Sequence, residues 1–277
     1  MVEASNTIVV TTDFSANSKA GIRFAVQLAK QRNAELIILH VYQVLRASFW
    51  SDTKYQNYVD QFREIWLQEL TGFVQGIFRH SNTKPANYRL AVYHSLHIVD
   101  GILAFSKENK AAFICTSTRG RSGIARVLGG TVSGLIAKSS MPLLCVPSTY
   151  RTKKIDRILY ATDMENIENE LKKVIEFSKF LNAEIIVAHL AFDYEHKMVP
   201  IRSIEYKVQY KWAKRDINRS IIEDLQVVIK NVRPAIVVFF TNRKDAFIEK
   251  LLTPNNAKEY FNSGKIPVLS IHKLSKK

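Results

Sequence analysis

Along the first half of the chain, short apolar runs alternate with segments in which apolar residues recur every three or four positions. The short runs are typical of buried strands, and the recurring pattern is typical of helices with one apolar face. The pattern predicts strands at residues 8–11, 36–42, 88–93, 112–116 and 143–146, and helices at residues 15–32, 58–78, 96–107 and 132–138. Nearly continuous apolar strands joined by helices indicate a five-stranded, parallel, doubly wound α/β sheet that is covered on both faces.

The predicted helix at residues 58–78 carries an aromatic and aliphatic stripe. Its members are Phe62, Trp66, Leu70, Phe73 and Ile77. This spacing places them on one side of a helix, as packing against a sheet requires. We interpret the stripe as part of the core rather than as a binding surface.

The chain contains an internal repeat. Two apolar stretches recur in the same order, each pair joined by a helix: residues 7–13 and 33–40 in the first half, and residues 156–163 and 182–189 in the second. Asp13 thereby matches Asp163, and each half ends in a strand that a proline precedes. We predict two tandem α/β domains, at residues 1–150 and 151–277.

The second half is shorter than the first. Too few residues lie between His189 and Ala235 for a helix, a strand and another helix. Residues 204–212 alternate between apolar and polar, which predicts a strand, and residues 220–230 predict a helix. The second domain is therefore expected to lack most of helix two, the helix between its second and third strands. We expect the other domain to cover the face left open.

Composition narrows the class of protein. The 277 residues are 47% hydrophobic, enough for a full core, and the net charge of +15 is divided almost evenly between the halves. The N-terminus lacks the pattern of a signal peptide, and no apolar run is long enough to span a membrane, so a cytoplasmic protein is expected. A diffuse positive charge attracts anions, but no nucleic-acid-binding motif is present, so nucleic acid is not favoured as a partner.

The two cysteines are expected to be inert. Cys115 and Cys145 each lie inside an apolar, strand-like run, and no histidine or cysteine stands at metal-ligand spacing beside them. Buried thiols of this kind behave as small apolar side chains.

A candidate anion site follows the strand at residues 112–116. A small, polar loop comes after it, and Gly130 and Thr131 then open a predicted helix. Glycine lets the backbone approach a phosphate, and the free N–H groups of a helix's first turn point at it. Arg119 adds positive charge nearby. A tight turn with a glycine-capped helix is the alternative.

Two further residues lie at the same predicted edge of the sheet. Asp13 follows the first strand and would hold a ribose hydroxyl, or Mg²⁺ through water; the alternative is an N-cap or Asx turn that opens the first helix. Val41 ends the second strand and would contact a base, or else is an ordinary core residue. His40 and His189 are interpreted as structural histidines. The sequence contains no G-x-S-x-G, H-E-x-x-H or Walker motif, so rapid chemistry is not expected.

The residues that carry these features resemble the universal stress protein family in its tandem, two-domain form. The similar segments cover residues 11–15, 39–42 and 118–147. The resemblance implies an adenine nucleotide alpha hydrolase-like fold. ATP-binding members carry the motif G-x2-G-x9-G-[S/T], in which x is any residue. This chain has Ser117, Gly120, Gly130 and Thr131 at those positions. Serine replaces the first glycine, and a positive φ there would cost about 1 kcal/mol.

By resemblance, one set of residues would surround ATP or a related adenine nucleotide, with Mg²⁺ near Asp13. The set is Thr12, Asp13, Val41, Thr116, Ser117, Arg119, Gly120, Gly130, Thr131, Val132 and Ser133. The second half has Thr241, Asn242, Arg243 and Lys244 where the first glycines belong, so we expect it to bind nucleotide weakly or not at all. The family pairs domains along the final strand. Residues 143–146 and 268–271 would therefore pair into an intramolecular pseudo-dimer, and further association into a homodimer is left open.

The sequence is compatible with three functions. The leading hypothesis is a cytoplasmic stress-response protein that binds adenine nucleotide in its N-terminal domain for sensing or regulation. The alternatives are an interaction or scaffold protein that binds no nucleotide, and a slow ATPase.

Overall fold

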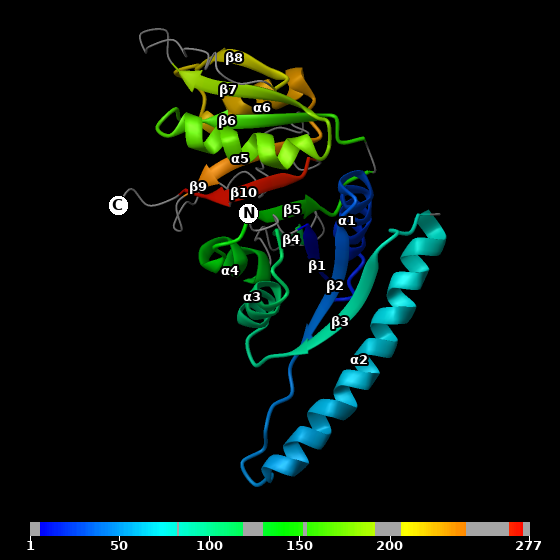
Figure 1. Cartoon of the computed structure of the whole chain (residues 1–277). Coiled ribbons are helices and arrows are strands. Elements are labelled where there is room, and N and C mark those ends of the chain that lie inside the picture. Colours follow the sequence, from blue (N-terminus) through cyan, green and yellow to red (C-terminus); the bar gives the residue numbers. More distant parts are fainter. Residues whose placement is uncertain are drawn as a thin grey trace.

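The fold was taken from a computed structural model of the whole chain (Figure 1). The structure describes residues 6–81, 83–118, 130–151, 154–191, 206–241 and 266–273. The predicted loss of helix two from the second half concerns residues 192–205, which lie outside the described residues. Among the residues described, no helix is long and apolar enough to cross a membrane.

The first part of the chain alternates strands and helices as its apolar pattern predicts. Its elements are β1 (Thr7–Thr11), α1 (Ser18–Arg32), β2 (Glu35–Tyr42), α2 (Asp52–Ser81), β3 (Tyr88–His94), α3 (Ile98–Glu108), β4 (Phe113–Thr118), α4 (Gly130–Lys138) and β5 (Leu143–Pro147). The second part repeats the plan with β6 (Arg157–Thr162), α5 (Ile167–Lys179), β7 (Glu184–Ala191), β8 (Val208–Lys214), α6 (Ile221–Val232), β9 (Ile236–Thr241) and β10 (Val268–His272).

The strands form one ten-stranded sheet, in the order β3-β2-β1-β4-β5-β10-β9-β6-β7-β8. Each half contributes five parallel strands, which confirms the predicted fold class. The halves meet where β5 and β10 pair antiparallel, with Leu144 opposite Leu269. The two predicted sheets are therefore continuous with each other, and the sequence pattern alone did not specify this.

The sheet is covered on both faces because apolar residues occupy both sides of its strands. Ile8 and Val10 of β1 pack into the cluster that includes α1, α2 and α5. Val9 points to the opposite face, whose cluster includes α3, α4 and α6. Successive strand residues point to opposite faces, so a run of apolar residues fills both layers.

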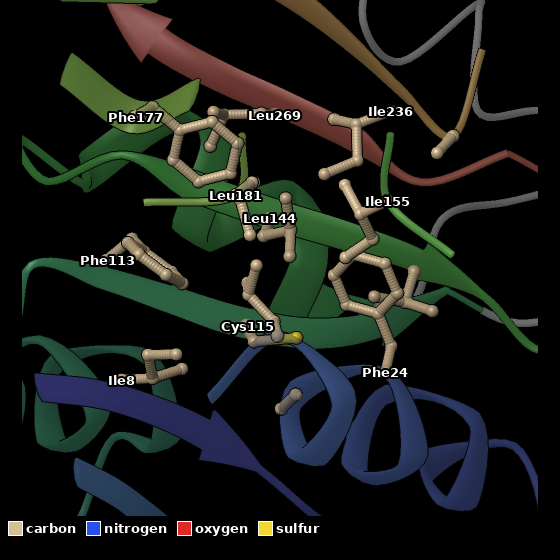
Figure 2. Close-up of a cluster of buried hydrophobic side chains, with 14 of the residues drawn as sticks. Ile8, Phe24, Phe113, Cys115, Leu144, Ile155, Phe177, Leu181, Ile236 and Leu269 are labelled. Carbon is tan, nitrogen blue, oxygen red and sulfur yellow. The ribbon is translucent and has the colours of Figure 1, made fainter. Parts of the chain in front are cut away.

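The core runs without a break across the junction of the halves. Figure 2 shows Phe113 and Leu144 of the first half near Phe177 and Leu181 of the second. The aromatic rings of Phe113 and Phe177 lie edge to face, with 5.9 Å between ring centroids. The halves thus share one hydrophobic core on this face, and each covers part of the other.

Two helices begin or end at residues whose chemistry favours a helix terminus. The Ser220 side chain accepts a hydrogen bond from the Glu223 N–H, and Glu223 bonds back to the Ser220 N–H, so a capping box starts α6 at the predicted place. Asn33 ends α1 in a left-handed conformation, with φ at 50°. By contrast, α2 begins at Asp52, earlier than the predicted residue 58, and its first half extends away from the sheet (Figure 1).

Candidate functional site

A cavity of about 330 Å³ opens at the carboxyl ends of β1, β2 and β4. The sheet order reverses between β1 and β4, because β1 is followed by β2 on one side and lies beside β4 on the other. This is where doubly wound sheets hold ligands. The lining residues are Thr11, Thr12, Asp13, Phe14, Ser15, Asn17, Ser18, Leu39, His40, Val41, Trp66, Ile98, Ile102, Thr116, Ser117, Gly130, Thr131 and Val132.

The turn after β1 is held by its own side chains. The Thr12 hydroxyl accepts a hydrogen bond from the Phe14 N–H at 3.1 Å, and Asp13 Oδ1 accepts one from the Ser15 N–H at 3.1 Å. Phe14 is left-handed, with φ at 60°, so the turn carries backbone strain that these bonds offset. Asp13 therefore forms an Asx turn. The N-cap interpretation is wrong, because α1 begins only at Ser18, after Asn17.

Ser117 lies in β4 and does not have a positive φ, so the expected backbone cost at this position does not arise. Its hydroxyl accepts a hydrogen bond from the Gly21 N–H at 2.8 Å and donates one to the Ser18 carbonyl at 3.3 Å. The first four N–H groups of a helix lack partners inside the helix. Ser117 satisfies one of them from the neighbouring strand, and so joins β4 to α1 beside the cavity.

Helix α4 begins at the cavity with Gly130. A Cβ atom added to Gly130 would meet no atom within 4 Å, so the backbone there borders open space. Thr131 and Val132 follow in the first turn and also line the cavity. Ser133 does not: its Oγ is buried, with no hydrogen-bond partner in the part of the chain that the structure describes.

An aromatic wall closes one side of the cavity, formed by Phe14, His40 and Trp66. Phe14 stacks on Trp66 with 5.6 Å between ring centroids, and His40 lies 4.4 Å from Phe14 and 4.9 Å from Trp66. Trp66 comes from the α2 stripe that was interpreted as core. Leu70 and Ile77 of that stripe are indeed buried, but Trp66 is only half-buried and reaches the site.

His40 is a structural histidine, as predicted. Its Nδ1 donates a hydrogen bond to the Thr12 carbonyl at 2.9 Å. Burial lowers the pKa of His40 from its ordinary value, although the bond to Thr12 and the charge of Asp13 act in the opposite direction. The imidazole is therefore neutral at neutral pH and presents an uncharged ring to the cavity.

The structure brings most of the predicted site residues together. The cavity is lined by Thr12, Asp13, Val41, Thr116, Ser117, Gly130, Thr131 and Val132. Arg119 and Gly120 lie outside the described residues. Ser18 and Trp66 also line the cavity, although neither was predicted as a site residue. The position of Ser18, in the helix that follows Asp13, could have indicated that it lies near the site. For Trp66, the sequence shows only its helical spacing, which does not separate a site residue from a core residue.

A metal site made by protein side chains alone is absent from the described part of the chain, where no group of three acidic, histidine or cysteine side chains converges. Asp13 is exposed, and one of its oxygens accepts the Ser15 N–H. A lone carboxylate beside a cavity suits Mg²⁺ that arrives with phosphates, since Mg²⁺ in such sites uses one or two carboxylates, substrate phosphates and water.

The second half repeats the strained turn. Met164 has φ at 71°, its N–H donates to the Thr162 hydroxyl at 2.9 Å, and Asp163 accepts the Glu165 N–H at 3.1 Å. Here, however, the carboxylate has a partner from the end of the same half: Lys273 Nζ pairs with Asp163 and with Glu165, the latter at 3.2 Å. Asp13 has no such ion pair with any residue that the structure describes in the first half.

The fold is that of a doubly wound α/β protein, and it has a cavity at its topological switch point. The model of the universal stress protein family matches residues 5–147, and the chain belongs to this family. The chain is 28% identical over 146 residues to universal stress protein YxiE of Bacillus subtilis (strain 168), an alignment that covers 51% of this chain and 98% of that protein.

Solved structures extend the likeness to the whole fold. A universal stress protein from Archaeoglobus fulgidus DSM 4304 superposes with a TM-score of 0.65 and 15% identity, over 97% of this chain and 98% of that one. A structure from Pseudomonas aeruginosa UCBPP-PA14 superposes with a TM-score of 0.50 and 11% identity, over 97% and 94%. At such low identity these structures show the shared fold alone.

Proposed function

We propose that the first half binds ATP, or a related adenine nucleotide, in the cavity at the switch point, and that the protein acts in sensing or regulation in the cytoplasm. The observation that carries this proposal is the convergence of eight expected ligand positions on one cavity. Its volume of about 330 Å³ lies at the lower end of the range for small-molecule sites, roughly 300–1,000 Å³.

The chemistry of the wall suits the parts of a nucleotide. Val41, with Leu39 and Ile102, gives an apolar surface for a base. Asp13 supplies a carboxylate for ribose hydroxyls or for Mg²⁺ that the phosphates carry. Helix α4 starts with Gly130 and Thr131, and the N–H groups of a helix's first turn suit phosphate oxygens.

The second half would act as a scaffold. Lys273 neutralises Asp163, so the carboxylate that would hold a ribose is engaged by the protein itself. The proposal therefore includes one nucleotide site for each chain.

The first experiment is mass spectrometry of any ligand released when freshly purified protein is heat-denatured, with ATP titration calorimetry on the same batch. Co-purified adenine nucleotide, or one site per chain, supports the proposal. Two sites would show that the second half also binds. No nucleotide and no heat at millimolar ATP would contradict the proposal and favour an interaction protein.

A matched pair of variants tests the site. Gly130→Asp and Gly130→Asn add side chains of the same size where a Cβ meets no other atom within 4 Å, so both should fold. The added carboxylate repels phosphates, so Gly130→Asp should lose ATP affinity by a larger factor than Gly130→Asn. Equal affinity in the parent and in Gly130→Asp would place the nucleotide elsewhere. ATP turnover in the parent, abolished in Asp13→Ala with binding retained, would instead indicate a slow ATPase.

A further inference from the structure

A second and larger cavity, of about 850 Å³, lies away from the nucleotide cavity and shares no lining residue with it. Its lining residues come from α1, the end of α2 and the segment that connects the two halves. Figure 1 shows where α1 and α2 lie. Its lining residues are Arg23, Val26, Gln27, Lys30, Gln31, Ile77, His80, Ser81, Thr83, Tyr150, Arg151 and Lys154. We call this cavity the basic groove.

The basic groove has a one-sided charge. Five of its lining residues are basic, namely Arg23, Lys30, His80, Arg151 and Lys154, and none is acidic. The helical spacing explains part of this arrangement: Arg23 and Lys30 are seven residues apart, and so lie on the same face of α1. The four arginines and lysines thus come from two separate segments, α1 and the connection between the halves, that the fold brings together.

In the part of the chain that the structure describes, the arginines and lysines of the basic groove have no carboxylate partner, unlike several other surface cations. Arg89 pairs with Glu35 at 3.0 Å, and Lys138 pairs with Asp100 at 2.9 Å. Within the described residues, no carboxylate oxygen lies within 4.0 Å of the charged nitrogens of Arg23, Lys30 or the two basic residues of the connecting segment. Like charges collected in this way repel one another, and an anion between them would remove that cost.

The floor of the basic groove is apolar and held in place. Val26, Ile77 and Tyr150 are each at most 6% exposed. The Tyr150 hydroxyl donates to the Gln27 side chain at 3.1 Å, and Gln31 bonds to both the N–H and the carbonyl of Ile155 at 3.4 Å. The connecting segment is therefore fastened to α1, and the groove is formed before any ligand arrives.

We infer that the basic groove binds a small polyanion that carries phosphate groups, at a site separate from the nucleotide cavity. Arginine and lysine together, with no carboxylate among the lining residues, are the donor set that phosphate oxygens prefer. The volume lies within the usual range for small ligands, roughly 300–1,000 Å³. The basic side chains gather around one hollow and do not form an extended stripe, which favours a small molecule over a duplex.

The test uses inorganic tripolyphosphate as the probe and the full chain carrying Gly130→Asp, so that phosphates cannot occupy the proposed nucleotide cavity. Calorimetry at low salt should show one site. Adding Lys30→Gln and Lys154→Gln should weaken binding by about tenfold or more, as expected when two charges that contact the anion are removed.

The control removes the same charge elsewhere. Lys107 and Lys172 are exposed and line neither cavity, so Lys107→Gln with Lys172→Gln gives an equal net charge. This pair should leave the affinity within about twofold of the Gly130→Asp protein. Equal weakening by both pairs would mean that only net charge attracts the probe, and would overturn the inference, as would absence of binding.

Competition identifies the class of ligand. If a short DNA duplex displaces tripolyphosphate and binds more tightly per site, the partner is a nucleic acid and the small-molecule assignment is wrong. This test does not depend on the nucleotide proposal. If the parent protein bound no nucleotide at all, the two pairs of lysine variants should still differ in their affinity for tripolyphosphate.

Discussion

Gly21 of α1 lies against β4 more closely than any side chain allows. A Cβ atom on residue 21 would come within 2.4 Å of Ser117 Oγ and 3.3 Å of the Ser117 backbone nitrogen. The Gly21 N–H also donates to that Oγ at 2.8 Å. We therefore predict that Gly21→Ala destabilises the protein and displaces the β4 end of the proposed nucleotide cavity.

The magnitude follows from opposing effects. Overpacking at a well-packed contact costs about 1–3 kcal/mol. Moving the serine hydroxyl aside also breaks its bond to the residue 21 N–H, which contributes about 1 kcal/mol. Alanine in a helix recovers about 0.5–1 kcal/mol relative to glycine. The net loss should be about 1–3 kcal/mol, which for a chain of this size lowers the melting temperature by about 2–4 °C per kcal/mol.

The assay is thermal unfolding of four proteins: the parent, Gly21→Ala, Gly72→Ala and the double variant Gly21→Ala with Ser117→Gly. Gly72 lies in α2, where a Cβ would meet nothing within 4 Å, so its alanine variant should be slightly more stable than the parent. Removing the serine side chain should restore part of the stability that Gly21→Ala loses, because the clash disappears but the hydrogen bond is not regained. The reasoning is refuted if Gly21→Ala melts at or above the Gly72→Ala protein, or if the second substitution restores nothing.

Three further predictions concern titratable side chains. Burial raises the pKa of the Cys145 thiol to about 12 and that of Cys115 well above its ordinary value, so neither thiol should react with a thiol reagent at pH 8 until the protein unfolds. Because the pKa of His40 is lowered from 6.5 in the fold, the unfolded chain takes up the proton first. Stability should therefore fall as pH drops below about 6.5, and melting curves at pH 7.5 and 5.5 should show a smaller fall in His40→Gln. Burial lowers the pKa of Lys273, but the hydrogen bonds and negative charges of Asp163 and Glu165 raise it by a larger amount. The pKa therefore lies above its ordinary value, and the ammonium stays charged. Lys273→Met should lower the free energy of unfolding by about 1 kcal/mol at most and leave one ATP site in calorimetry; a second site would show that the lysine alone blocks the second half.

Most of the fold could be predicted from the sequence, because apolar periodicity reports burial. Strand β2 begins one residue before its predicted start, and helix α4 two residues before. The start of α2 could not be found in this way. Its first residues extend beyond the sheet (Figure 1). Apart from Tyr55, residues 52–58 are exposed, so this stretch has no apolar periodicity that would predict a helix.

The site was harder to predict than the fold, because two of its features depend on contacts between distant segments. Ser117 was expected to strain the backbone, whereas its hydroxyl instead caps a helix that lies 96 positions away in sequence at Gly21. Trp66 follows core periodicity yet lines the cavity, where it contacts Phe14 and His40. Neither contact can be predicted from the local pattern of apolar and polar residues.

The antiparallel pairing of β5 and β10 has a consequence for how the assembly responds to dilution. Leu143, Leu144 and Cys145 bond to partners on the same chain, so the two five-stranded units are held together by a covalent tether. An association between separate chains weakens as concentration falls, whereas a tethered one has a fixed effective concentration. The ten-stranded sheet should therefore persist at any protein concentration at which the chain itself remains folded, even at the lowest levels of expression.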